Sequence, residues 1–161
     1  MKTKNWLIAA IILLSSVSVS AQDLFEKLGD SDHITSVYIS KALLKMFPGM
    51  ADKANVNING VDGIDLDNIV SKLEQVDIYT SDNKEGAQLI RTEAKKLQSQ
   101  NKSYELLMRV KTESENVTFY AEKEKDRFKS LVMFVDSGEE CTLIRLLGSF
   151  TAEDIQNVTK K

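Results

Sequence analysis

The stretch SLVMFVDSGEECTLIRLLG, from Ser130 to Gly148, decides the fold. Its two halves, LVMFV and TLIRLL, are short apolar runs, and a polar link of turn-forming residues separates them. Short apolar runs bounded by turn residues are typical of strands, and a short link between two of them predicts an antiparallel hairpin. The stretch also holds the only cysteine of the chain, Cys141.

Two more runs precede this hairpin and extend the pattern. Tyr104–Lys111 reads YELLMRVK and Asn116–Lys123 reads NVTFYAEK, and along both the side chains vary with a period of two. Polar stretches, including the charged run Glu122–Lys129, separate the four segments. Four successive strands with short connections predict an antiparallel four-strand meander in the C-terminal half.

The N-terminal half mixes helical and extended patterns. Helices are expected over Asp23–Gly29, Lys41–Phe47 and Asp65–Gln75, strands over His33–Ser40 and Val76–Thr80, and a polar loop over Asn55–Asp65. A helix continuing through Phe47 is the alternative for the first of these strands. Because the segments do not alternate in regular β–α–β units, the sequence predicts one α+β domain over residues 22–161. Its sheet is expected to be multi-stranded and largely antiparallel, with helices packed mainly on one face.

Two helix starts carry capping signals. Asp82 and Glu85 have the spacing of a capping box, in which each side chain accepts a hydrogen bond from a free backbone N–H. The helix that follows is expected to reach about Gln100. Its predicted buried stripe consists of Ala87, Ile90, Ala94 and Leu97. A last helix is expected from Thr151, with Asp154 as the acid of its first turn.

The first 21 residues have the organisation of a secretory signal peptide. Lys2 and Lys4 precede the apolar run Trp6–Leu14, and small residues follow up to a cleavage site before Gln22. The apolar run is too short for a transmembrane helix, which needs about 20 residues. No cysteine follows the cleavage site, so a lipoprotein is not expected. The sequence therefore predicts a soluble periplasmic or extracellular protein without a transmembrane segment.

The charge of the exported chain argues against nucleic acid as a partner. Removal of Lys2 and Lys4 lowers the basic residues from 21 to 19 against 24 acidic ones, which gives a net charge of −5. Binding to nucleic acid depends on clustered basic side chains that neutralise phosphates, and no such stripe is present.

The alternation of side chains assigns the meander residues to two faces of the sheet. Tyr104, Leu106, Met108 and Val110 fall on one face, and most charges fall on the other, together with large apolar side chains. The candidate partner surface on that second face comprises Leu107, Arg109, Tyr120, Val132, Phe134, Leu143, Arg145 and Leu147. It would meet an unknown protein, an apolar ligand or a second copy of the chain. The alternative is that a helix or the loop Asn55–Asp65 covers it.

Reactive and metal-binding side chains are sparse. Three roles are open for Cys141: a packed thiol, half of an intermolecular disulfide or a reactive group. A reactive thiol needs a nearby base, and nothing in the sequence places the single histidine, His33, close to it. Oxygen ligands cluster at Asn57, Asn59, Asp62, Asp65 and Asp67, but without the EF-hand spacing, so turn and capping roles explain them. No catalytic, cofactor-binding or metal-binding residue is assigned, and no cofactor is expected.

The segments VYISKALLKM, YELLMRV and LIRLLGSFTAEDI, behind a signal peptide, resemble the small exported proteins grouped as domain of unknown function 4252. The resemblance spans nearly the whole exported chain. It implies a bacterial envelope setting and no catalytic residues, since the family has no assigned activity. The leading hypothesis is a non-enzymatic binding or interaction protein with an unknown partner. The alternative is a small envelope hydrolase that uses an acid pair.

Overall fold

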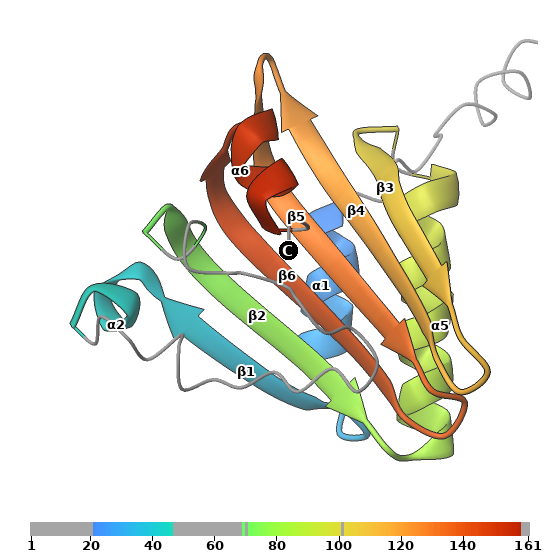
Figure 1. Ribbon diagram of the computed structural model, residues 1–161. Helices are drawn as coiled ribbons and strands as arrows, with labels where there is room; N and C mark the ends of the chain where they lie inside the picture. Colours follow the sequence, from blue (N-terminus) through green and yellow to red (C-terminus); the bar gives the residue numbers. More distant parts are fainter. Residues whose placement is uncertain (1–20, 47–68, 70, 101, 159–161) are drawn as a thin grey trace, which may run out of the picture.

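The computed structural model describes residues 21–46, 69, 71–100 and 102–158. Its strands form one open antiparallel sheet in the order β1-β2-β6-β5-β4-β3 (Figure 1). The strands are β1 (Thr35–Ser40), β2 (Leu73–Ser81), β3 (Tyr104–Lys111), β4 (Asn116–Glu124), β5 (Arg127–Asp136) and β6 (Cys141–Phe150). The helices are α1 (Ala21–Gly29), α2 (Lys41–Met46), α5 (Lys84–Gln100) and α6 (Ala152–Val158). The predicted α+β class and the C-terminal meander are confirmed.

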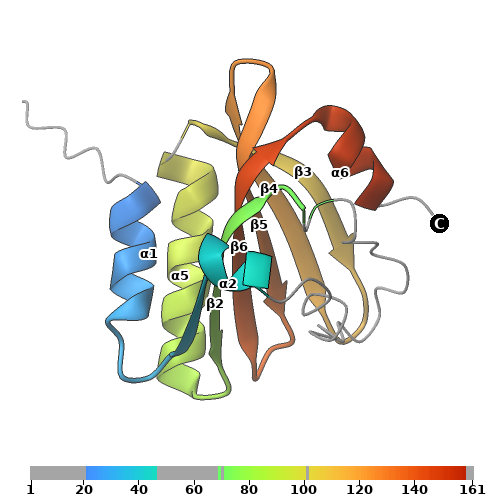
Figure 2. The ribbon, with the colours of Figure 1, turned by 90° about the vertical axis from the view of Figure 1, so that its left-hand side faces the viewer.

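Helices lie on both faces of the sheet, and the two longest share one face. Figure 2 shows α1 and α5 side by side against one side of the sheet and α6 against the other. Leu44 of α2 and Ile155 of α6 pack into the apolar cluster of that second side. We call the side under α1 and α5 the helix face and the other side the opposite face. Of the helices that the structure describes, none is long and apolar enough to cross a membrane.

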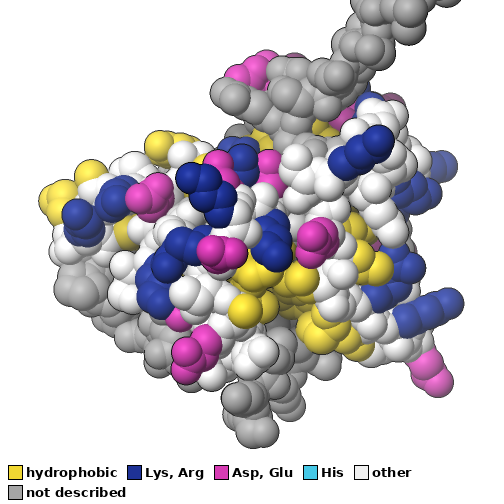
Figure 3. All heavy atoms as spheres, turned by 90° about the horizontal axis from the view of Figure 1, so that it is seen from above, with side chains coloured by type: hydrophobic (Ala, Val, Ile, Leu, Met, Phe, Trp, Pro, Cys, Tyr) yellow, Lys and Arg dark blue, Asp and Glu magenta, His cyan; other side chains and the backbone are white. Residues whose placement is uncertain are grey.

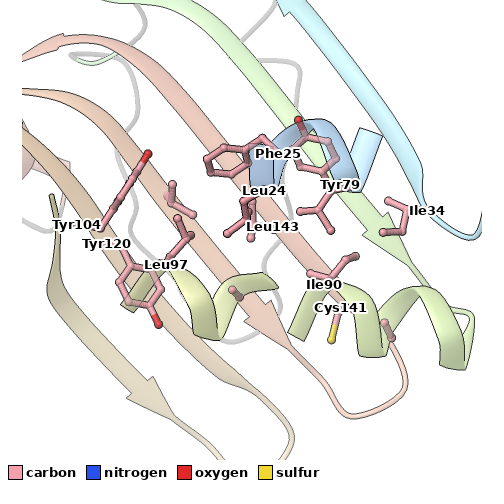
Figure 4. Packing of buried hydrophobic residues seen from close by; sticks show 14 residues of the cluster. Leu24, Phe25, Ile34, Tyr79, Ile90, Leu97, Tyr104, Tyr120, Cys141 and Leu143 are labelled. Atoms are coloured by element: carbon pink, nitrogen blue, oxygen red, sulfur yellow. The ribbon is translucent and has the colours of Figure 1, made fainter. Parts of the chain in front are cut away.

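The stripe on α5 packs against the helix face as its sequence predicts. Ala87, Ile90, Ala94 and Leu97 are each at most 1 % exposed, because helical spacing places them on one side of α5. Figure 4 shows how they and other side chains fill the space between the helices and the sheet. Their partners in this cluster are Leu24, Phe25, Leu28, Ile34, Tyr79, Tyr104, Tyr120, Val132, Cys141 and Leu143.

A second apolar cluster occupies the opposite face. Its fully buried members include Ile69 and Phe150, at 1 % and 0 % exposed. Half-buried side chains surround them: Ile39, Leu44, Ile78, Phe128, Leu131, Met133, Leu146 and Ile155. Apolar residues on both faces explain why β5 and β6 have continuous apolar runs rather than a strict alternation.

A bulge in β3 changes the predicted face of Tyr104. The pairing of β3 with β4 shifts between Leu106 and Met108, so Leu107 is the extra residue. A one-residue shift moves the side chains beyond it to the other face. Tyr104 therefore shares the helix face with Arg109, and the predicted assignment of Tyr104 to the face opposite Arg109 is wrong.

Two predicted boundaries differ from the structure. β2 begins at Leu73, so the last residues of the expected helix Asp65–Gln75 belong to a strand. From Leu73 onward this strand pairs with β6. The charged run Glu122–Lys129 is no loop: β4 and β5 continue through it, and Glu124 pairs with Arg127 around a two-residue turn. Charged side chains remain solvated on both strands of such a hairpin, which removes the need for a loop.

The first turn of α5 is capped by a different residue from the predicted one. The side-chain oxygen of Asn83 accepts hydrogen bonds from the backbone N–H groups of Glu85 at 2.8 Å and Gly86 at 3.5 Å. Asn and Asp cap helices equally well, so the sequence alone could not choose between Asp82 and Asn83. Glu85 Oε2 instead lies 3.0 Å from His33 Nε2.

Several expectations concern segments outside the described residues. These are the signal peptide up to residue 20, the loop Asn55–Asp65, the first part of the helix Asp65–Gln75 and the cluster Asn57, Asn59, Asp62, Asp65 and Asp67. Within the part of the chain that the structure describes, no group of three His, Cys, Asp or Glu side chains could hold a metal ion.

The start of α6 forms the reciprocal cap that its sequence predicts. The backbone N–H of Thr151 donates to Asp154 Oδ2 at 2.7 Å, and that of Asp154 donates to Thr151 Oγ1 at 3.2 Å. Lys72, just before β2, also donates to Asp154 Oδ1. Hydrogen bonds from Lys72 and then from Thr151 lower the pKa of Asp154 to about 2, against an ordinary value of 3.8. Asp154 thus fastens α6 to the start of β2.

Replacement of Asp154 by Asn is expected to have an effect that depends on pH. Because the folded pKa is depressed, the carboxylate stabilises the fold above pH 4, and this contribution is lost as the pH falls through about 2. Lys72 is partly exposed, so we expect a loss of about 1–2 kcal/mol at pH 7. Urea unfolding of both proteins between pH 7 and pH 2 should show the difference shrinking below pH 4. Glu153→Gln, an exposed acid in the same turn, is the control; a difference that stays constant with pH would contradict the prediction.

Candidate interaction surface

The apolar centre of the candidate partner surface lies beneath the helices. Tyr120, Val132 and Leu143 are 4 %, 0 % and 0 % exposed, and all three belong to the cluster under α1 and α5. Phe134 packs against the same cluster, and Leu147 is half-buried on β6. The chain's own helices therefore occupy the position that a partner would take at this part of the face.

Arg145 is likewise an interior residue rather than part of a rim. Its guanidinium Nη2 lies 2.6 Å from Asp77 Oδ2, and its Nε donates to the same oxygen at 2.7 Å. The guanidinium also stacks over the ring of Phe25, with Cζ 3.9 Å from the ring centroid. The side-chain amide of Gln75 donates to both oxygens of Asp77, at 2.9 and 3.0 Å. This buried ion pair joins β2, β6 and α1.

Only two members of the candidate partner surface are exposed, and both lie on β3 at the edge of the sheet. Leu107, the bulge residue, is 40 % exposed, and Arg109 donates to Gln98 of α5 at 3.5 Å. Neighbouring Leu106 is 43 % exposed. Tyr104, at the start of the strand, is buried and donates to Ser130 at 3.0 Å. Burial raises the pKa of Tyr104 to about 12. Contact of Leu107 and Arg109 with a partner stays a prediction.

Cys141 is a packed thiol at the start of β6. It is 0 % exposed, and its Sγ donates to Asp136 Oδ1 at 3.4 Å. Burial, and then the negative charge of Asp136, raise the pKa of Cys141 to about 12. Arg91 binds Asp136 through two hydrogen bonds of 2.9 Å and holds the pKa of that carboxyl below its ordinary value. The thiol therefore stays protonated at neutral pH, and the arrangement offers no route to a thiolate nucleophile.

Cys141 is expected to react with a thiol reagent only when the protein unfolds. Burial keeps the reagent away, and the raised pKa keeps the thiolate fraction negligible below about pH 10. Labelling with an aromatic disulfide reagent should be slow in native buffer and should accelerate across the urea unfolding transition. Cys141→Ser serves as the control without a thiol. Rapid labelling in native buffer, or a reducible dimer on a gel, would contradict this prediction.

An open polar hollow of 410 Å³ lies beside Arg91, and several of the residues that line it are hydrogen-bonded to one another. The β3–β4 and β5–β6 turns form its walls: Lys111, Thr112, Glu113, Ser114, Glu115, Asn116, Asp136, Ser137 and Gly138. Arg91 is paired with Asp136 and also donates to the carbonyl of Gly138. Thr112 and Glu115 close the first turn through hydrogen bonds of 2.8 to 3.2 Å. These hydrogen bonds stabilise the two turns, and they do not form an arrangement of catalytic side chains.

The β1 edge, which we define as Thr35–Ser40, is the most exposed apolar feature of the sheet. It pairs with β2 in a regular register and forms the end of the strand order. Val37 and Tyr38 are 44 % and 65 % exposed. The segment TSVYIS contains no charge and no proline. The sequence predicts no role for these residues beyond an uncharged strand pattern between charged flanks.

The other edge of the sheet has the protection that the β1 edge lacks. β3 carries Glu105, Arg109 and Lys111, and its bulge at Leu107 interrupts the ladder. Charges and bulges are the means by which natural sheets keep their edges from pairing with other chains. Among the residues that the structure describes, the β1 edge is therefore the one whose strand has neither a charge nor a bulge.

The fold and these contacts define a class: an α+β protein with an open antiparallel sheet, a buried thiol and, within the described residues, one edge strand without charges or a bulge. Within that class the chain belongs to the family described as Domain of unknown function (DUF4252), whose family model matches residues 25–158. The resemblance seen in the sequence is thereby confirmed. No curated protein and no solved structure matches the chain.

Proposed function

We propose that the protein is an exported, non-enzymatic binding module of the bacterial envelope and that it binds a partner along the β1 edge. The observation that carries the proposal is the uncharged, regular edge strand with Val37 and Tyr38 exposed. An added strand gains main-chain hydrogen bonds from such an edge, while the outward side chains provide selectivity.

Two further observations support this proposal. The buried Cys141, with a pKa raised to about 12, and the exposed His33, paired with Glu85, do not combine into a nucleophile and base. Export is supported by the sequence, in which Lys2 and Lys4 precede the apolar run Trp6–Leu14. We therefore propose that the protein binds its partner outside the cytoplasm.

Site-specific crosslinking in the producing bacterium tests the proposal. A photoreactive amino acid at position 38 should give one discrete adduct in the envelope fraction, because that side chain projects from the β1 edge. The same amino acid at position 106, on the protected β3 edge and 43 % exposed in the native protein, is the matched control. Equal crosslinking at both positions, or none at position 38, would refute binding along the β1 edge.

A further inference from the structure

We infer that the occupant of the β1 edge is a second copy of the chain, whose own β1 edge pairs antiparallel across a two-fold axis. This inference rests on the proposal that the β1 edge is the binding surface, and it names the partner. The two six-stranded sheets would then continue into one another. Three features of the edge support a second copy: its side-chain pattern, its flanking charges and its contrast with the other edge.

The side chains of β1 are complementary to themselves. Val37 and Ile39 lie opposite Ile78 and Val76 of β2, on the opposite face, whereas Ser36, Tyr38 and Ser40 lie on the helix face. A two-fold axis at Tyr38 places Val37 against Ile39 of the second copy and Ser36 against Ser40 of the second copy. Apolar meets apolar and hydroxyl meets hydroxyl. A two-fold interface requires this self-complementarity.

The charges at the two ends of the strand favour the antiparallel direction. Exposed Asp30 and Asp32 precede β1, and exposed Lys41 and Lys45 follow it in α2. Lys41 also pairs with Glu74 of its own chain at 2.9 Å, and Figure 3 shows basic, acidic and hydrophobic side chains next to one another at the left of the view. Antiparallel pairing brings the acidic end of each copy to the basic end of the other, twice in each dimer. Parallel pairing would place like charges together.

The two edges of the sheet limit the assembly to a dimer. A head-to-tail contact between β1 of one copy and β3 of the next would build an open filament. The charges of β3 and the bulge at Leu107 oppose that contact. Pairing of β1 with β1 uses both unprotected edges and leaves none free, so the assembly closes at two copies.

Sedimentation equilibrium of the exported chain tests the inference. The native protein should be a dimer at micromolar concentration. Tyr38→Lys should weaken the association by about tenfold or more, because it places two cations directly opposite each other at the axis. Leu106→Lys, at an exposed position on the β3 edge, should leave the dimer intact. Thermal melts of both variants check that they are folded. A monomeric native protein, or a dimer that Tyr38→Lys does not weaken, would overturn the inference.

A charge-exchange experiment tests the direction of pairing. Asp32→Lys places a cation at the acidic end of the β1 edge, and Lys45→Glu places an anion at its basic end, so each variant alone should associate several-fold more weakly at low salt. An equimolar mixture of the two should regain association, because each contact between the two variants again joins opposite charges. Failure of the mixture to regain association would refute antiparallel pairing.

The inference and the proposed function can fail separately. The crosslinked adduct at position 38 has the mass of two chains if the inference holds. An adduct of another mass, from a protein that sediments as a monomer, would overturn the inference and leave the β1 edge as a binding surface. Slow hydrogen exchange along the outer side of β1 in a monomer would mean that the chain covers its own edge. The inference and the proposed function would then both be wrong.

Discussion

Replacement of Leu143 by aspartate is expected to destabilise the protein by about 4 kcal/mol or more, enough to unfold a domain of ordinary stability. Leu143 is 0 % exposed, lies between Tyr79 and Phe134 across the sheet and faces α1 and α5. Truncation of a buried leucine alone costs about 2–5 kcal/mol. A carboxylate without a partner in the same place adds the cost of its burial.

Leu107→Asp is the matched control for this change. Leu107 was assigned to the same candidate partner surface, yet it is 40 % exposed at the bulge of β3. A change at such a site is expected to alter the free energy of unfolding by less than about 0.5 kcal/mol. Urea unfolding of both variants measures the contrast. Similar, small effects at the two positions would mean that α1 and α5 do not cover this face.

Replacement of Arg145 by methionine is expected to cost about 3–5 kcal/mol, because it leaves the carboxylate of Asp77 buried without its cation. Asp77 is 4 % exposed, and the hydrogen bonds from Gln75 compensate only part of its charge. The stacking of the guanidinium on Phe25 is lost at the same time. Urea unfolding of the single variant should therefore show one of the largest losses in the protein.

The double variant Asp77→Leu/Arg145→Met separates the charge from the packing. Removal of both partners takes away the unpaired charge, and buried pairs replaced by apolar residues are often no less stable than the original. The double variant is thus expected to regain most of the stability lost in Arg145→Met. Lys41→Met, which breaks the exposed pair with Glu74, should cost less than about 1 kcal/mol. A double variant as unstable as Arg145→Met would refute the argument.

Local patterns predicted the elements that local chemistry determines. The stripe on α5 and the reciprocal cap of Thr151 and Asp154 follow from residues a few positions apart, and the structure contains both. The strands of the meander follow in the same way from short apolar runs and turn residues. Each of these features depends on spacing along one segment, which is what a sequence displays directly.

The features that sequence missed depend on contacts between distant segments. Both faces of β5 and β6 are apolar, so the pattern could not tell which face α1 and α5 would cover. Because α1 and α5 cover this face, the part of the candidate partner surface around Leu143 is buried in the core. The bulge at Leu107 has no sequence signature, yet it moved Tyr104 to the helix face. The role proposed for Tyr38 depends on the strand order, which places β1 at an edge of the sheet.

The position of β2 beside β6 has a consequence for how the chain folds. The two strands pair residues that lie between 60 and 75 positions apart, from Ser81 with Cys141 to Leu73 with Gly148. Loop-closure entropy delays such pairings, whereas the hairpins of the meander need only short loops. In the sheet β1 pairs with β2, so it is joined to the meander only through β2. We therefore expect the N-terminal half to acquire its structure last, although it is synthesised first, and a chain stopped before β6 to lack the strand that joins β1 and β2 to the meander.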